Sequence, residues 1–285
     1  MKDLAKETWS SGEAYERWVG RWSRAVAAEF LAWLRVPPGQ AWGDVGCGTG
    51  VLTERILAAC EPSSVDGIDR SDAFIAAAHD KIKDPRVRFE VGDALALPWP
   101  DRCYDVVVSG LVLNFVAQPE AMVREMKRVT RPGGRVAAYV WDYSGGMQMV
   151  RHFWDVAIEL RPHDAELDQA ERFPICRPDA LQTLFAEAGL DAVAVRAVDV
   201  PMHFRDFDDY WQPFLGKQGA APTYLAGLDA AAREGIREAL RARLVAADDG
   251  SIAMLARAWT VQGSVGLLAN SSYAATGIDR SGKAI

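Results

Sequence analysis

From residue 40 to about residue 141, short apolar runs alternate with stretches in which apolar side chains recur every three or four positions. The first pattern predicts buried strands, and the second predicts helices that bury one face. The predicted strands are 41–45, 65–69, 87–91, 104–110 and 135–141. Because strands and helices alternate, the sequence predicts an α/β fold with a doubly wound sheet. A ligand of such a sheet lies at the carboxyl ends of its strands.

Helix signals fall between these strands. Ile56 and Leu57 mark the apolar face of a helix after the first strand. Ser71 is placed to cap the helix after the second strand, and Pro119 to open the helix after the fourth. That last helix should stop at the segment "RPGG", 131–134.

The regular alternation ends after Trp141. We expect a mixed segment at about 142–177, a helix ending at Gly189, a strand at 191–200, helices within 201–250 and a final strand at 252–261. The resulting division is an N-terminal helical cover at 1–39, a main domain at 40–265 with inserts at about 142–177 and 201–250, and a flexible tail at 266–285. We interpret both inserts as lids.

Composition narrows the class of protein. The chain has 285 residues, 25% of them charged, and a net charge of −7, with no basic stripe of the kind that binds nucleic acid. No segment is long and apolar enough to span a bilayer, and the first residues lack the apolar core of a signal peptide. Cys47, Cys60, Cys103 and Cys176 form no C-x-x-C pair, so we expect no metal site. These features predict a cytoplasmic protein with free thiols.

The segment "DVGCGTG", 44–50, follows the first predicted strand. A dinucleotide fingerprint reads G-x-G-x-x-G, with an acidic residue about 20 positions further on that holds the ribose. Gly46 and Gly48 fit that pattern, but Val51 stands at the third glycine position. Asp69 supplies the acidic residue. The sequence therefore predicts ribose recognition without the pyrophosphate part of the pattern.

Four segments in order carry a more specific signal: "DVGCGTG", "GIDRS", "GDALALPWPDRCYDVVVSG" and "RVTRPGGRVAAYVWD". Together they resemble the class I S-adenosylmethionine-dependent methyltransferases, in the broad small-molecule group called type 11. The resemblance is close over residues 40–142. It implies a Rossmann-like sheet of seven strands, mostly parallel with the last strand antiparallel, and helical inserts over the active site. It also implies S-adenosyl-L-methionine as the cofactor and S-adenosyl-L-homocysteine as the product.

The cofactor-binding residues that the resemblance implies are Asp44, Gly46, Cys47, Gly48, Asp69, Arg70, Gly92, Asp93, Ala94 and Ser109, with Tyr15 and Arg24 from the N-terminal helix. Asp44 would approach the methionyl amino group, and Asp69 would accept hydrogen bonds from both ribose hydroxyls. Asp93 and the backbone of Ala94 would bind adenine, and the carbonyl of Ser109 would face the amino group. The chain departs from the family pattern at Arg70, and at Gly43, where a branched apolar residue generally precedes the aspartate.

Methyl transfer depends mainly on aligning donor and acceptor, so the sequence need not display a catalytic residue. The candidates for a general base are His203, His152 and Asp142, each with a surface or packing role as the alternative. Asn114 stands where the wider family often has histidine. Aromatic residues are frequent in both inserts, which suits a planar or apolar acceptor, although for most of them we expect packing within the inserts.

The sequence thus predicts a methyltransferase acting on a small molecule, and three alternatives remain open. A nicotinamide-dependent oxidoreductase would share the fold and the role of Asp69. A non-catalytic protein could bind S-adenosylmethionine without an acceptor. A nucleic-acid or protein methyltransferase is the third, and the acidic balance disfavours a nucleic-acid substrate.

Overall fold

The computed structural model describes residues 20–216 and 219–267. A sheet of seven strands runs through the molecule in the order β3-β2-β1-β4-β5-β7-β6. Neighbouring strands from β3 to β5 are parallel, whereas β7 is antiparallel to both β5 and β6. The predicted Rossmann-like topology is therefore confirmed. The strands are β1 (Ala41–Val45), β2 (Ser64–Asp69), β3 (Val87–Val91), β4 (Tyr104–Gly110), β5 (Thr130–Trp141), β6 (Asp191–Phe204) and β7 (Ile252–Ser264).

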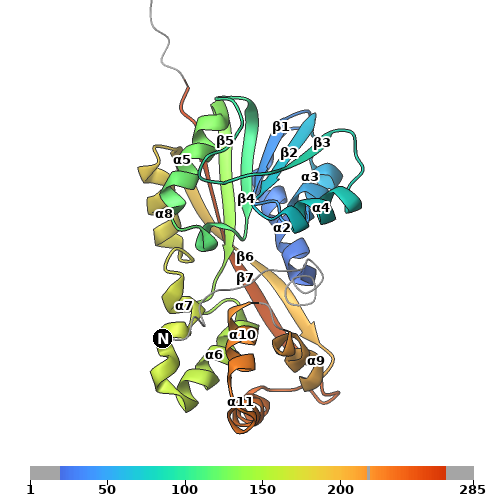
Figure 1. Cartoon of the computed structure of the whole chain (residues 1–285), viewed down its shortest axis with the longest axis vertical. Coiled ribbons are helices and arrows are strands. Elements are labelled where there is room, and N and C mark those ends of the chain that lie inside the picture. Colours follow the sequence, from blue (N-terminus) through green and yellow to red (C-terminus); the bar gives the residue numbers. More distant parts are fainter. Residues whose placement is uncertain (1–19, 217–218, 268–285) are drawn as a thin grey trace, which may run out of the picture.

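Helices cover both faces of the sheet (Figure 1). One face carries α2 (Arg21–Leu34), α3 (Val51–Ala59) and α4 (Asp72–Lys81), and the other carries α5 (Pro119–Val129) and α8 (Pro178–Glu187). The strands between them are buried, with Trp42, Val107 and Val108 fully enclosed. The helix signals of the sequence are confirmed: the hydroxyl of Ser71 accepts from the Phe74 amide at 3.3 Å, and Pro119 opens α5.

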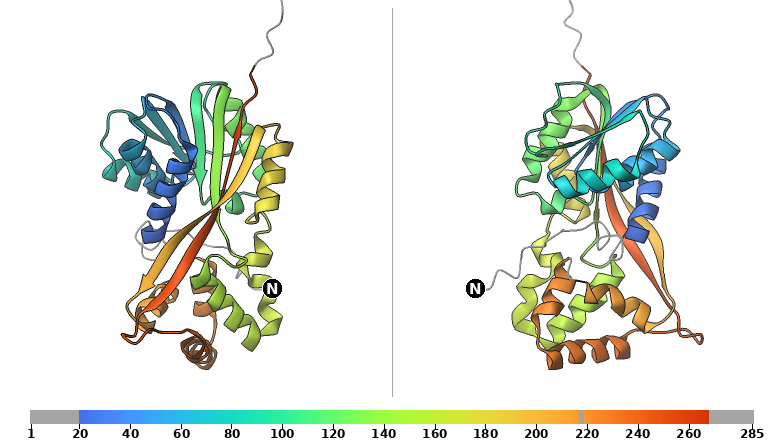
Figure 2. Two further views of the ribbon diagram at one scale, coloured as in Figure 1. Left: turned by 180° about the vertical axis from the view of Figure 1, so that it is seen from behind. Right: turned by 45° about the vertical axis from the view of Figure 1, so that its right-hand side comes forward.

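A second group of helices surrounds the far ends of β6 and β7 (Figures 1 and 2). It contains α6 (Gln148–Leu160), η3 (Pro162–Leu167), α7 (Gln169–Arg172), α9 (Phe207–Trp211), η4 (Gln212–Leu215), α10 (Ala220–Gly227) and α11 (Ala230–Arg243), while the short η2 (Leu113–Phe115) follows β4. Aromatic rings form the core of this group. Phe153 stacks on Phe214 with centroids 4.8 Å apart, and Trp154 lies 5.2 Å from Tyr224. The expectation that most of these aromatic residues pack within the inserts is confirmed.

Three strand boundaries were predicted wrongly, and one of them is the end of β7, which continues to Ser264 instead of ending at residue 261. β6 continues to Phe204 instead of ending at residue 200, so the segment 201–250 begins as a strand. Proline cannot donate a ladder hydrogen bond, but β6 is an edge strand, where Pro201 is tolerated opposite Leu255. β5 begins at Thr130 instead of residue 135 because Gly133 and Gly134 exchange backbone hydrogen bonds with Val265, a residue distant in sequence.

Gly43 lies on β1 beneath two aromatic rings. A Cβ at this position would stand 3.1 Å from the Trp99 ring and 3.3 Å from the Tyr104 ring, which contact each other edge to face at 4.9 Å. The space that a branched residue would fill is therefore taken by rings from two other segments. This explains the departure from the family pattern.

We expect Gly43→Val to lower the free energy of unfolding by about 1–3 kcal/mol, because the two γ carbons must displace a packed ring. Urea unfolding followed by circular dichroism measures the change. Gly145→Val is the matched control, since a Cβ at Gly145 meets no atom within 4 Å. Equal stability of the two variants would show that the Trp99–Tyr104 pair does not need Gly43.

No helix in residues 20–216 and 219–267 is both long and apolar enough to cross a membrane.

Candidate cofactor and active site

A cavity of about 590 Å³ lies at the carboxyl ends of the central strands. Its wall comes from the loop after β1, the ends of β2 and β3, the segment after β4, the first turns of α3 and α4, and single residues of α2 and β5. β5 runs toward the second helical group, which the chain enters at α6 (Figure 1). Because the other central strands run parallel to β5, the cavity opens on the side of the molecule that faces these helices.

The glycine loop forms one wall of the cavity. Gly46 has φ +75°, and a Cβ there would stand 2.5 Å from Cγ2 of Val112, so both conformation and space require glycine. Gly48 also has positive φ, but a Cβ there would meet no atom within 4 Å. The backbone at Gly48 is therefore open to a ligand. The amides of Gly46 and Cys47 donate to the Ile68 carbonyl, which ties the loop to β2.

Asp69 ends β2 and lies beside this loop. Its two carboxylate oxygens accept hydrogen bonds from the Gly48 amide at 3.0 Å and the Ser71 amide at 2.9 Å. A carboxylate has about four acceptor positions, so each oxygen retains capacity for another donor. The two amides hold the carboxylate in a fixed orientation at the cavity wall. This geometry suits a pair of adjacent hydroxyl groups on a ligand.

Asp44 is fully buried near the end of β1 and lines the same cavity. Its Oδ2 accepts from the Thr53 hydroxyl at 2.7 Å, whereas its Oδ1 has no hydrogen-bond partner among the described residues. Burial, with a smaller contribution from the Asp69 charge, raises the pKa of Asp44 to about 7. A buried carboxylate with one unsatisfied oxygen is costly unless a positive or hydrogen-bonding group approaches it.

The remaining predicted contacts of the β1, β2 and β3 loops also lie in the wall: Cys47, Arg70, Gly92, Asp93 and Ala94. Burial raises the pKa of the Cys47 thiol, so this side chain is a neutral part of the wall. Asp93 is exposed, and its Oδ1 accepts from the Leu95 amide at 2.9 Å. This Asx turn fixes the carboxyl group at the rim of the cavity.

Two predicted cofactor contacts do not line the cavity. Ser109 is buried in β4 and is absent from the wall, which Gly110 and Leu111 form instead. Arg24 does not line the cavity, and one of its guanidinium nitrogens donates to the Gly20 carbonyl at 3.4 Å. Tyr15 lies outside the described residues.

None of the proposed general bases lines the cavity. His203 is exposed on β6, opposite Ala253. His152 lies on α6, where burial lowers its pKa. Asp142 orients a turn, because its Oδ1 accepts from both the amide and the hydroxyl of Ser144. Asp142 directly follows the carboxyl end of β5 but accepts from Ser144, whereas His152 lies on α6 and His203 near the far end of β6.

Sequence reasoning missed the wall on the side of β4. It consists of Ser23 from α2, the apolar residues Leu111, Val112, Phe115, Val116 and Ala117, and Tyr139 from β5. The continuation of apolar residues past the end of the fourth strand was a visible signal for this wall. The sequence around Ser23 and around Tyr139 carries no signal for a cavity. These residues reach the wall only because of the way α2 and β5 pack.

Clusters of histidine, cysteine, aspartate or glutamate suited to a metal ion are absent from the part of the chain that the structure describes.

Comparison with known proteins identifies the family to which this chain belongs. Residues 43–138 match the family model of a methyltransferase domain. The chain is 30% identical over 184 residues to the ubiquinone/menaquinone biosynthesis C-methyltransferase UbiE of Burkholderia orbicola, covering 60% of this chain and 75% of that protein. The chain belongs to the class I S-adenosylmethionine-dependent methyltransferases. Its cofactor is accordingly S-adenosylmethionine, and the interpretation as a nicotinamide-dependent oxidoreductase is excluded.

Solved structures agree with the fold of this methyltransferase. The BH2331 protein of Bacillus halodurans superposes with a TM-score of 0.60 at 12% identity, over 85% of this chain and 99% of that one. A phosphoethanolamine N-methyltransferase of Haemonchus contortus, solved with S-adenosyl-L-methionine, superposes with a TM-score of 0.54 at 17% identity, over 90% and 56% of the two chains. At these identities the likeness concerns architecture alone.

Proposed function

We propose that this methyltransferase acts on a small, neutral and largely apolar acceptor that binds against the wall following β4. The observation that carries the proposal is the composition of that wall. Five residues of the segment line it, and none of them is ionisable: Leu111, Val112, Phe115, Val116 and Ala117. Apolar pockets with few polar groups select ligands by shape and apolar contact.

For the cofactor, the residues present fit the chemical groups that must be held. Asp44 offers a buried, unsatisfied carboxylate oxygen, which suits the positively charged methionyl part. Asp69, held by two amides, would accept hydrogen bonds from the ribose hydroxyls. The open backbone at Gly48 would lie along the methionyl chain, and Asp93 with the Ala94 amide would bind adenine.

When bound, the sulfonium supplies a methyl group that is already activated for in-line displacement. The contribution of this chain is then alignment: the glycine loop and the two acidic residues fix the donor, and the wall after β4 holds the acceptor and excludes water. The relative named as a C-methyltransferase makes planar compounds with a nucleophilic carbon the first acceptors to test. Oxygen and nitrogen acceptors of similar shape form the next group.

The inserts would act as lids, as their sequence position suggested. In the described residues neither 142–177 nor 201–250 contributes a side chain to the cavity wall. Their helices nevertheless stand beyond the carboxyl ends of the central strands, on the side where the acceptor would enter (Figure 1). We propose that this group limits the size of the acceptor and shields the reacting atoms from solvent.

An assay with tritium-labelled S-adenosylmethionine tests the proposed function. We expect turnover with neutral planar phenols, quinols or indoles that carry apolar substituents, and little with anionic or cationic counterparts of the same shape. Turnover confined to charged acceptors would contradict the proposal. Calorimetric binding of S-adenosylmethionine without transfer to any acceptor would favour the non-catalytic binding protein.

His203→Ala should leave the rate of methyl transfer within about tenfold of the wild type, because His203 is exposed on β6 and alignment dominates the reaction. The comparison uses the first acceptor found in the assay, at saturating cofactor. A loss of several hundredfold would identify His203 as a base brought to the acceptor by a conformational change.

A further inference from the structure

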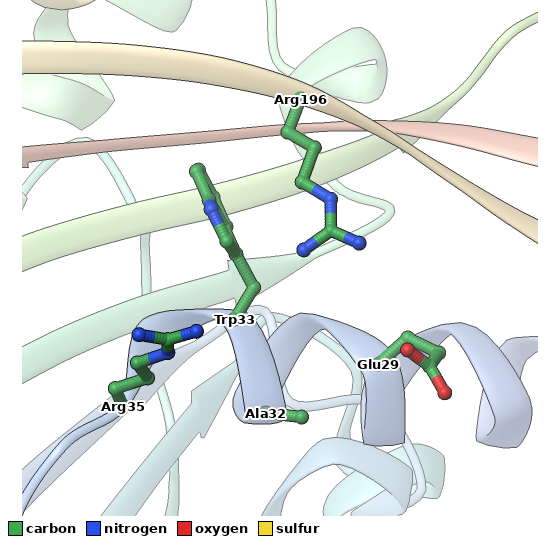
Figure 3. A pocket seen from close by; sticks show the side chains of 5 residues that line it. All are labelled: Glu29, Ala32, Trp33, Arg35 and Arg196. Carbon is green, nitrogen blue, oxygen red and sulfur yellow. The ribbon is translucent and has the colours of Figure 1, made fainter.

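A second cleft lies between the C-terminal half of α2 and the edge strand β6, with a volume of about 340 Å³. Its lining residues are Glu29, Ala32, Trp33, Arg35 and Arg196 (Figure 3). It shares no residue with the cofactor cavity. The cleft is therefore a separate feature of the surface.

The cleft follows from how α2 packs on β6. Glu29, Ala32 and Trp33 lie three and four residues apart, so they share one face of the helix. At the other end of this contact, Trp22 closes the interface against Phe204, with ring centroids 5.5 Å apart. Toward Arg196 no such pair fills the space, and the interface opens.

Two guanidinium groups border the opening. The side chains of Arg35 and Arg196 make no hydrogen bond or ion pair with any residue of the described segments. The last carbonyl of α2, at Leu34, is already satisfied by Arg135, so neither arginine is needed as its cap. Arg35 itself adopts a left-handed conformation, φ 49° and ψ 47°, at a position where glycine is usual.

Trp33 stands between the two arginines in Figure 3. Its ring is half-buried and forms no stacking or cation–π contact within residues 20–216 and 219–267. Glu29 lies one turn before Trp33 in the helix, on the side of the cleft away from Arg35. A flat apolar surface is thus flanked by two unpaired positive charges, on a chain whose net charge is −7.

We infer that this cleft binds a small planar organic anion, with its ring against Trp33 and its carboxylate against the guanidinium groups that border the cleft. The guanidinium group presents donors in a planar fork that matches a carboxylate, and it retains its charge at every physiological pH. An indole surface favours a flat ring over an inorganic ion of the same charge. The volume is within the range of small-molecule sites.

Fluorine NMR titration with para-fluorobenzoate tests the inference on the full chain, with S-adenosylhomocysteine present to fill the cofactor cavity. We expect saturable binding with a dissociation constant of about 1 mM or tighter. Arg196→Gln and Arg35→Gln should each weaken it by at least about tenfold, because a charge-assisted hydrogen bond is lost. Trp33→Leu should also weaken it, whereas Arg88→Gln, an exposed arginine on β3 at the opposite sheet edge, should not.

Two further ligands distinguish the contribution of the negative charge to binding from that of the aromatic ring. Neutral para-fluorobenzamide should bind at least about tenfold more weakly than the carboxylate, and inorganic phosphate should not displace the carboxylate at equal concentration. The inference is overturned if para-fluorobenzoate does not bind at about 10 mM. It is equally overturned if Arg196→Gln binds as well as Arg88→Gln, or if the benzamide binds as tightly as the benzoate. Circular dichroism of each variant confirms that the fold is retained.

Discussion

Asp44→Asn is expected to weaken S-adenosylmethionine binding by at least about thirtyfold while stabilising the cofactor-free protein above about pH 7. The hypothesis rests on the burial of Asp44 and on its unsatisfied Oδ1 at the cavity wall. A cation bound there gains a charged partner. Without the cofactor, the same charge is buried without compensation.

The sign of the stability change follows from the pKa of Asp44, which burial raises from 3.8 to about 7. Below about pH 4 the carboxyl group is neutral in both folded and unfolded chains, so it costs nothing. As the pH rises to about 7, the unfolded chain ionises first, and the folded state loses stability. The full loss, reached above about pH 7, is up to about 4 kcal/mol at 1.4 kcal/mol for each pKa unit.

Urea unfolding at about pH 4.5 and about pH 8 measures this effect. Asp44→Asn should exceed the wild type only slightly, by about 1 kcal/mol, at the lower pH and much more at the higher pH, because the amide carries no charge. Asp80→Asn, an exposed residue of α4, is the control and should follow the wild type at both values. A variant that is less stable than the wild type at about pH 8 would show that the Thr53 hydrogen bond outweighs the buried charge.

Cofactor affinity supplies an independent readout. In the wild type, affinity for S-adenosylmethionine should increase as the pH rises through about 7, since the ionised carboxylate attracts the cation. Asp44→Asn should bind weakly at every pH. Adenosine lacks the methionyl part, so its affinity should be nearly the same for both proteins. Loss of adenosine binding would place Asp44 beside a different part of the cofactor.

Asp69→Ala is expected to lower the affinity for S-adenosylmethionine, S-adenosylhomocysteine and adenosine alike, by at least about 2 kcal/mol, or roughly thirtyfold. Two effects combine. The ribose would lose its acceptors, and the amides of Gly48 and Ser71 would lose the carboxylate that holds the glycine loop against the start of α4. The affinity of Asp69→Asn for these ligands should lie between those of Asp69→Ala and the wild type, because asparagine retains one acceptor oxygen.

Isothermal titration calorimetry with the three ligands separates this residue from Asp44. Adenosine binding should respond to Asp69 and not to Asp44. Asp72→Asn, three residues further along and exposed, is the control for local charge. Unchanged affinity of a folded Asp69→Ala protein for all three ligands would remove Asp69 from the site.

The loops that form one side of the cavity could be predicted from the sequence because their determinants are local. Gly46 and Gly48 follow β1 directly, Asp69 ends β2, and Ser71 caps the next helix within three residues. Each of these features depends on loop conformation or on the end of one strand, and parallel strand ends meet at one edge of a sheet.

Only the tertiary structure decided which residues form the opposite side of the cavity. Ser23 and Tyr139 reach the cavity wall from α2 and β5, and the aromatic residues of the inserts pack on one another away from that wall. Pro201 lies within a strand because β6 is at the sheet edge, and Gly43 is glycine because Trp99 and Tyr104 cover it. Periodicity and loop conformation are properties of a short segment, so the chain itself determined the sheet and the cofactor loop. Burial and wall contacts depend on segments far apart in sequence, and folding alone brings those together.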